Sequence, residues 1–284
     1  MELGGRSAVC PAMTEHPSPP GRNDVYLFFA LACGITWALD LPLAFAWATQ
    51  AAPPPYAMPM VGLGAWGPTL AAFAIAARRR SLRAVFGRWR TNPMYVVLGL
   101  FVPLAMQLPP TLIEIALGGH PAHWFYPPLR PEQFAALLVF PFAEEFGWRG
   151  FAYPRLEERH GPVVGSLILG CVWGLWHLGM LFVPEPFRAL PPATVLVYMV
   201  ELSLWSVVIA WMFERGNRSI AVAIAIHAGE HLDNVNRAPE TEFRLRILRF
   251  VVLAIVAALA ARSLAAKRRH ATRAVAIFRT SSIP

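Results

Sequence analysis

Two carboxylates and an arginine lie within one apolar stretch of the chain, at Glu144, Glu145 and Arg149. Ionisable groups cost about 2.5 to 3.5 kcal/mol each at the centre of a bilayer on insertion scales, so chains keep them there mainly where they pair or face a wet cavity. Two further apolar stretches carry three histidines: His177, His227 and His231. Carboxylates and imidazoles are the side chains that move protons in hydrolysis. The combination indicates an active site inside a membrane.

The two adjacent glutamates are predicted to have different roles. Residues four apart share a face of a helix, so Glu145 and Arg149 should form a neutralising pair. Glu144 lies about 100° around the helix from Glu145 and has no such local partner. We therefore predict structural support from Glu145 and Arg149, and chemistry from Glu144.

The histidines follow the same spacing rule. His177 lies four residues after Trp173, and His231 lies four residues after His227, so each pair should share one helix face. Such a set could hold a water against Glu144 and donate hydrogen bonds to a developing oxyanion. We interpret Trp173 as structural support, and Trp173 with the neighbouring Trp176 as packing or interface anchors.

The composition is that of a membrane protein. The 284 residues are 56% hydrophobic and 15% charged, with a mean hydropathy of +0.45, whereas soluble domains carry about 25% charge. The net charge of +8 is explained by basic loops, and no nucleic-acid-binding motif is present. The three cysteines have no metal-ligand spacing, and a disulfide framework is not expected.

The apolar runs predict an all-α, polytopic bundle of about eight membrane spans. We divide the chain into a disordered tail (1–24), a transmembrane domain (25–266) with its motifs in 134–235, and a basic cytoplasmic tail (267–284). The fourth and seventh spans are short and polar. The expected spans are 25–49, 57–77, 94–117, 134–148, 162–183, 193–213, 219–234 and 247–265.

The basic residues predict the orientation. With eight spans and the N-terminus inside, 19 of the 25 Lys and Arg residues fall in inside segments and 6 in outside ones. Positive charge concentrates on the cytoplasmic side of membrane proteins. This distribution favours N-in and C-in, and we expect a multi-pass protein of the inner (plasma) membrane.

At these residues the chain resembles the CPBP family, which comprises type II CAAX prenyl endopeptidases and bacteriocin-processing or immunity (ABI) proteins. The family pattern is Glu-Glu-x-x-x-Arg, an aromatic followed by x-x-x-His, and His-x-x-x-Asn. Glu144 to Gly150 match the first motif, and Trp173 to His177 match the second with Trp in place of Phe. The third motif matches at His227 only, because His231 replaces the usual Asn.

The resemblance implies a glutamate-dependent intramembrane protease that acts on a membrane-associated peptide or protein. By this analogy Glu144 and His177 activate water, while His227 and His231 bind the oxyanion. A neutral imidazole can donate one hydrogen bond, so His231 could replace the Asn. The arginine bias suggests a bacterial source, which gives no reason to expect a prenylated substrate.

Three alternatives remain open. His227-x-x-Glu230-His231 fits the H-x-x-E-H zinc motif, in which two histidines bind metal and Glu acts as base, and Glu144 or His177 would supply a third ligand. A non-catalytic binding or immunity protein could use the same pocket for a peptide. A transporter would use a polar path formed by three other intramembrane acids: Asp40, Glu114 and Glu201.

Overall fold

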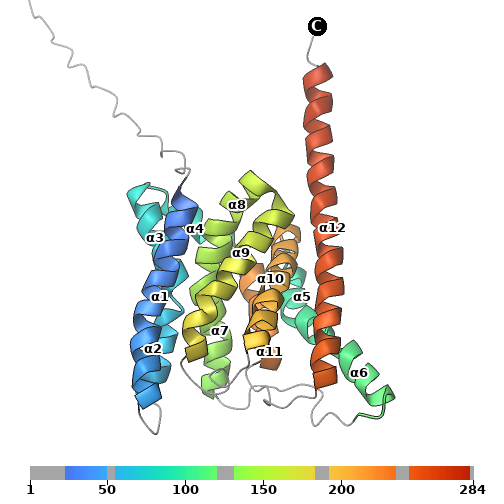
Figure 1. Cartoon of the computed structure of the whole chain (residues 1–284). Coiled ribbons are helices and arrows are strands. Elements are labelled where there is room, and N and C mark those ends of the chain that lie inside the picture. The colour runs from blue at the N-terminus through green and yellow to red at the C-terminus, as the bar shows by residue number, and fades with distance from the viewer. Residues whose placement is uncertain (1–22, 50–54, 120–130, 183–191, 235–242, 282–284) are drawn as a thin grey trace, which may run out of the picture.

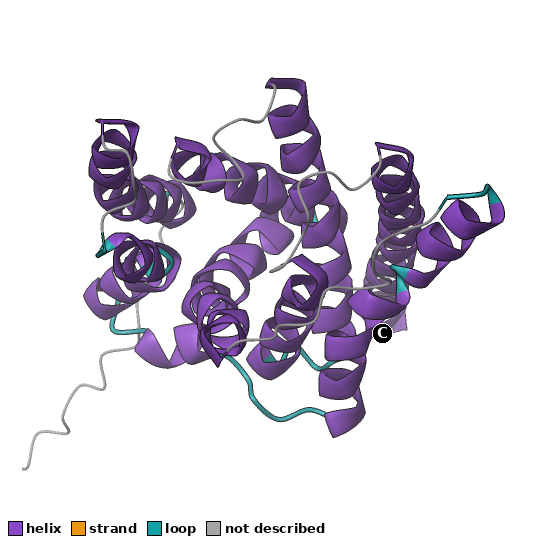
Figure 2. Cartoon of the chain, turned by 90° about the horizontal axis from the view of Figure 1, so that it is seen from below, coloured by secondary structure: helices purple, strands orange, loops and turns teal. Residues whose placement is uncertain are grey.

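The computed structural model describes residues 23–49, 55–119, 131–182, 192–234 and 243–281. Within these ranges every regular element is a helix, as the colouring of Figure 2 shows. The prediction of an all-α, polytopic bundle is confirmed. Most of the expected disordered tail (1–24) and several loops lie outside the described residues.

Six helical segments among the described residues are long and apolar enough to cross a membrane. The fourth and seventh predicted spans are helices of only 15 residues each, α7 (Pro131–Glu145) and α11 (Ile220–Asn234). The other helices are α1 (Asp24–Thr49), α2 (Ala57–Gly64), α3 (Gly67–Arg78), α4 (Leu82–Phe86), α5 (Pro93–Ala105), α6 (Leu108–Ala116), α8 (Tyr153–His160), α9 (Pro162–Trp176), α10 (Pro192–Arg215) and α12 (Phe243–Ser281).

The segments that we predicted to share the inner side lie at one end of the bundle. Figure 1 places the start of α1, the helices α4 and α8, and the C-terminal end of α12 at this end. Ion pairs also bring neighbouring turns to this end: Arg79, after α3, bonds to Asp24 of α1 at 2.9 Å, and Arg218, between α10 and α11, bonds to Glu157 of α8 at 2.7 Å. We call this the arginine-rich end. That it faces the cytoplasm stays a prediction.

The fourth predicted span is not one regular helix. After α7 the chain continues as a π-helix, η1 (Phe146–Ala152), before α8 begins. The fifth predicted span likewise changes type, because α9 is followed by a 3-10 helix, η2 (His177–Phe182). π-Turns inside helices are rare and occur mostly at functional sites. Both changes fall at the predicted site residues.

Glycines let the π-helix lie against its neighbours. A Cβ at Gly147 would lie 2.5 Å from the backbone carbon of Pro68 in α3, and one at Gly150 would lie 2.4 Å from the Val85 carbonyl oxygen in α4. Real Cβ atoms essentially never approach backbone so closely. Only glycine therefore fits at these two positions of the motif.

The helix before His177 is fixed in the same manner. A Cβ at Gly170 of α9 would lie 2.5 Å from the Cα of Ser203 in α10, and one at Gly174 would lie 3.3 Å from the Cβ of Met199. Small residues allow membrane helices to approach closely, so van der Waals packing holds α9 on α10. This packing sets the depth and the rotation of His177.

The predicted basic tail is not separate from the last span. α12 is a single helix of 39 residues that runs on to Ser281, past the end of its apolar segment at Arg269. It extends beyond the rest of the bundle at the arginine-rich end (Figure 1).

We predict that Gly147→Ala destabilises the protein, because the new methyl group meets backbone that cannot move aside. Overpacking of this kind costs about 1–3 kcal/mol. Gly34→Ala in α1 is the matched control, since a Cβ there meets nothing within 4 Å. Thermal unfolding in detergent should show a lower midpoint for Gly147→Ala and no decrease for Gly34→Ala. Equal midpoints would contradict the close packing of η1 on α3.

Candidate active site

Glu145 is the anchor of the site. Its Oε1 accepts hydrogen bonds from Arg149 Nη1 at 2.7 Å and from His227 Nδ1 at 2.8 Å. All three side chains are at most 1% exposed. The predicted Glu145–Arg149 pair is therefore present. The bond to His227 was not predicted, and it joins the first motif directly to the third.

Glu144 is held by neutral donors. Its Oε2 accepts hydrogen bonds from the indole Nε1 of Trp148 at 3.1 Å and of Trp173 at 2.9 Å, and the side chain is buried. Glu144 has no local ion pair, but Trp148, four residues along, is a neutral local donor that was not predicted. Its Oε1 accepts no hydrogen bond from the described residues. One oxygen is thus fixed, and the other is available to a small molecule.

Trp173 lies at the centre of the site. Besides its bond to Glu144, its ring centre lies 5.6 Å from that of His177 and 5.1 Å from that of His227. The Arg149 guanidinium lies over the same indole at 5.4 Å, a cation–π geometry. The support role predicted for Trp173 agrees with this geometry. Of the two alternatives for Trp173 and Trp176, packing is confirmed and interface anchoring is not, because both side chains are buried in the core and hydrogen-bonded.

His177 is oriented by its own backbone and by α1. Its Nδ1 lies 2.8 Å from the Trp173 carbonyl oxygen. A carbonyl can only accept, so Nδ1 carries the proton and Nε2 presents a lone pair. The preceding turn is tied to α1, since Trp37 Nε1 donates to the Trp176 carbonyl at 3.0 Å. Trp176 Nε1 donates in turn to Thr36 Oγ1 at 2.7 Å.

His227 and His231 lie on one face of α11, as predicted, with ring centres 4.8 Å apart. Since a carboxylate only accepts, the bond to Glu145 places the proton of neutral His227 on Nδ1. In this form Nε2 is an acceptor, and it becomes a donor only when the ring is charged. The side chain of His231 is 22% exposed and that of His227 only 1%, so the site opens on the side of His231.

The described residues do not fit the zinc alternative. Among them no three His, Cys, Asp or Glu side chains are grouped to hold a metal ion. His227 directs Nδ1 to Glu145, and His231 Nε2 lies 3.6 Å from Glu230 Oε2. Zinc requires three or four ligands at about 2.0–2.3 Å in a tetrahedral arrangement.

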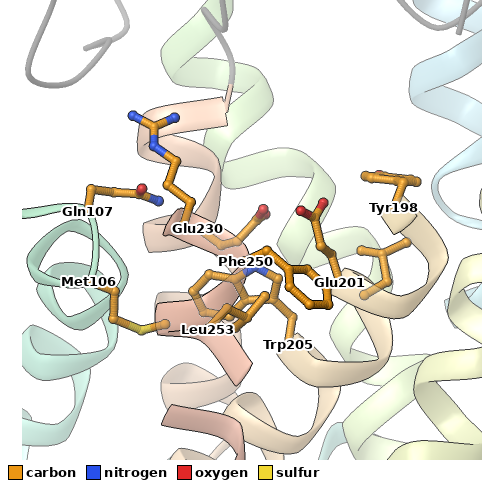
Figure 3. Close-up of a pocket in the computed structure, with 10 residues that line it drawn as sticks. Met106, Gln107, Tyr198, Glu201, Trp205, Glu230, Phe250 and Leu253 are labelled. Carbon is orange, nitrogen blue, oxygen red and sulfur yellow. The ribbon is translucent and has the colours of Figure 1, made fainter. Parts of the chain in front are cut away.

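A small cavity lies next to residues that contact the histidines, and Figure 3 shows the side chains that line it. Tyr198, which lines it, packs edge-on against His177 with ring centres 5.9 Å apart, and Glu230 in its wall precedes His231. Its volume of about 40 Å³ is enough for water. The cavity lies between α10, α11 and α12 beside the α5–α6 turn. Its walls are formed by Met106, Gln107, Tyr198, Glu201, Leu202, Trp205, Glu230, Arg249, Phe250 and Leu253.

The three other intramembrane acids lie apart from one another. Asp40 of α1 is buried beside Gly64 and Gly179, and Glu114 of α6 is buried beside Gly119. Glu201 of α10 lines the cavity near the histidines. Asp40 and Glu114 are not among the residues that line this cavity, and a shared polar path stays an unconfirmed alternative.

Three residues that contact the predicted site were missed by sequence reasoning: Trp148, Tyr198 and Thr36. Trp148 could have been found, since it lies at the same four-residue spacing from Glu144 that identified the Glu145–Arg149 pair. Tyr198 and Thr36 come from other helices, and nothing in the local pattern marks them.

The family-model match falls on the segment that carries these motifs. Residues 128–232 match the family model described as type II CAAX prenyl endopeptidase, Rce1-like. The chain is 30% identical over 109 residues to CAAX prenyl protease 2 of Methanococcus maripaludis, a match that covers 34% of this chain and 37% of that protein. The segment 128–232 is thus similar to the Rce1-like type II CAAX prenyl endopeptidase family, and the chain spans well under half the length of the relative it matches.

Proposed function

We propose that this protein is an intramembrane endopeptidase that hydrolyses a peptide bond in a membrane-associated peptide or protein. The observation that carries the proposal is the asymmetric binding of Glu144. Two indole N–H groups fix one of its oxygens, while the other accepts no hydrogen bond from the described residues. A carboxylate in this state is oriented to bind a water and to take its proton. The family match supports the same chemistry.

His177 is the second base of the proposed reaction. Its Nε2 lone pair is available because Nδ1 donates to the Trp173 carbonyl. A water held between Glu144 Oε1 and His177 Nε2 would attack the scissile carbonyl carbon and give up one proton. That proton passes to the leaving amine as the C–N bond breaks. Positioned proton transfer contributes about 10²–10⁴-fold to such reactions.

His227 and His231 would stabilise the oxyanion of the tetrahedral intermediate. With Nδ1 bonded to Glu145, His227 donates from Nε2 only as an imidazolium, and the adjacent Glu145 carboxylate would stabilise that charge. A donor aimed at the developing oxyanion contributes about 2.7–4 kcal/mol in well-studied hydrolases. In this account Glu145 orients the His227 ring through Nδ1, and the charged ring donates from Nε2.

Water and substrate would reach the site from the side of His231. Glu144 and His227 are buried, whereas His177 and His231 are half-buried and adjoin the small cavity. Water is scarce in a bilayer, so an intramembrane hydrolase needs polar space next to its base. The carboxylates in the cavity wall would keep that space wet.

The replacement of Asn by His231 favours one second candidate, a binding or immunity protein without catalysis. Such a protein would use the same pocket to hold a peptide. The two functions differ in what Glu144 contributes, since binding does not require a general base.

We predict that Glu144→Gln abolishes cleavage, with a loss of at least about 100-fold, because Gln cannot accept a proton. The control is Glu158→Gln, which removes an exposed carboxylate of α8 away from the site. Mass spectrometry of new peptide termini in membranes that contain wild type or either variant measures the effect without a known substrate. New termini that survive in Glu144→Gln would contradict the mechanism. A biological function that survives without new termini would favour the binding candidate.

We predict that Glu145→Gln lowers stability, because it leaves the buried Arg149 without a compensating charge. Breaking a buried pair on one side costs about 3–5 kcal/mol, whereas replacing both partners by apolar groups is much less harmful. Thermal midpoints in detergent should therefore rank wild type, then Glu145→Gln/Arg149→Met, then Glu145→Gln. If Glu145→Gln alone unfolded at the wild-type midpoint, the Glu145–Arg149 pair would contribute nothing to thermal stability.

We predict that the purified protein carries less than stoichiometric zinc, because the described residues do not converge on a metal. Elemental analysis of wild type and His231→Ala side by side checks this. Near-stoichiometric zinc that is lost in His231→Ala would instead establish His231 as a ligand and replace the glutamate–histidine mechanism.

A further inference from the structure

A second cavity lies at the arginine-rich end, between the α8–α9 turn and α12. Its volume is about 630 Å³, which is in the range of small-molecule sites. None of its lining residues belongs to the Glu144 site. We call it the basic cleft. Its lining consists of His160, Gly161, Pro162, Val163, Val164, Ala265, Arg268 and Arg269.

The basic cleft presents positive charge. Arg268 and Arg269 come from α12 and His160 from the end of α8, and the lining contains no acidic side chain. Neither acid of α8 lines the cleft: Glu157 is bonded to Arg218 at 2.7 Å, and Glu158 is exposed. The cleft therefore favours an anion.

The backbone of the α8–α9 turn supports this preference. A Cβ at Gly161 would lie 1.9 Å from Arg268 Nη1, so the guanidinium occupies space that any other residue would fill. Gly161 also has φ +82°, a conformation that suits glycine. It precedes the first turn of α9, where unpaired N–H groups and the helix dipole attract negative charge. The start of α9 would therefore attract an anion in addition to the arginines of α12.

The cleft lies at the level of the bilayer surface. The apolar segment of α9 begins at Pro162, and that of α12 ends at Arg269, and both residues line the cleft. From there an exposed apolar face descends along α9 through Val164, Leu167 and Leu175, spaced for one side of the helix. The positively charged cleft therefore lies directly next to an apolar face of α9 that would contact lipid.

We propose that the basic cleft binds an anionic phospholipid, with its phosphate against Arg268 and Arg269 and its acyl chains along α9. Basic pockets between membrane helices bind acidic head groups in this manner. A free anion would use the arginines and not the apolar face, and an acidic protein segment would not need a cleft at the bilayer surface. The site is independent of the proposed proteolysis.

The test is lipid retention by the full-length protein, measured by native mass spectrometry after titration with phosphatidylglycerol or phosphatidylcholine. Wild type should retain phosphatidylglycerol preferentially. Arg268→Ala/Arg269→Ala should weaken this retention about tenfold or more. The matched control, Arg78→Ala/Arg83→Ala, removes two exposed arginines from the same end of the bundle and should retain the lipid. Equal losses in both double variants would show general surface attraction and overturn the site.

A second variant tests the cleft without changing its charge. Val164→Trp places a large side chain at an exposed lining position, 49% accessible, and should also reduce phosphatidylglycerol retention. Unchanged retention in Val164→Trp would contradict occupation of the cleft. Inorganic phosphate should compete poorly at millimolar concentration. Complete displacement by phosphate would show a free-anion site in place of a lipid site.

Discussion

Two adjacent carboxylates are buried in a membrane helix, and the rest of the site follows from how each is satisfied. Glu145 is bonded to a charge, Arg149, and to His227. Glu144 is bonded to two neutral indoles and so keeps proton affinity that a salt bridge would remove. One carboxylate organises the structure and the other is left for chemistry. Burying two carboxylates costs free energy unless each has hydrogen-bond partners, and these partners come from neighbouring helices.

The directions of the hydrogen bonds assign the roles of the imidazoles. A backbone carbonyl fixes the proton of His177 on Nδ1, and a carboxylate fixes that of His227 on the same atom. Such partners behind a functional histidine determine its orientation and tautomer. The surroundings of the two rings differ: His177 is half-buried and packs against Tyr198 in the cavity wall, whereas His227 is buried beside the Glu145 carboxylate. We therefore propose a base from the first and a chargeable donor from the second.

Short-range spacing and hydropathy predicted much of this arrangement. The Glu145–Arg149 pair followed from a separation of four residues, the bundle from its apolar runs, and the grouping of arginines from the alternation of loops. The contact of Glu145 with His227 spans 82 positions, so no local pattern reveals it. The π-helix packs closely on α3 and α4 at Gly147 and Gly150, and these contacts between helices are not visible in the motif itself. Residue spacing predicts contacts between side chains on the same helix, whereas contacts between different helices depend on tertiary packing.

The central claim is that Glu144 and His177 share one water. An experimental structure in lipid nanodiscs, at a resolution that shows ordered water, tests it directly. We predict a water within about 2.6–3.2 Å of both Glu144 Oε1 and His177 Nε2, with Oε2 still bonded to Trp148 and Trp173. A Glu144 Oε1 that is bonded to another side chain, or a His177 Nε2 that faces away from Glu144, would contradict the account.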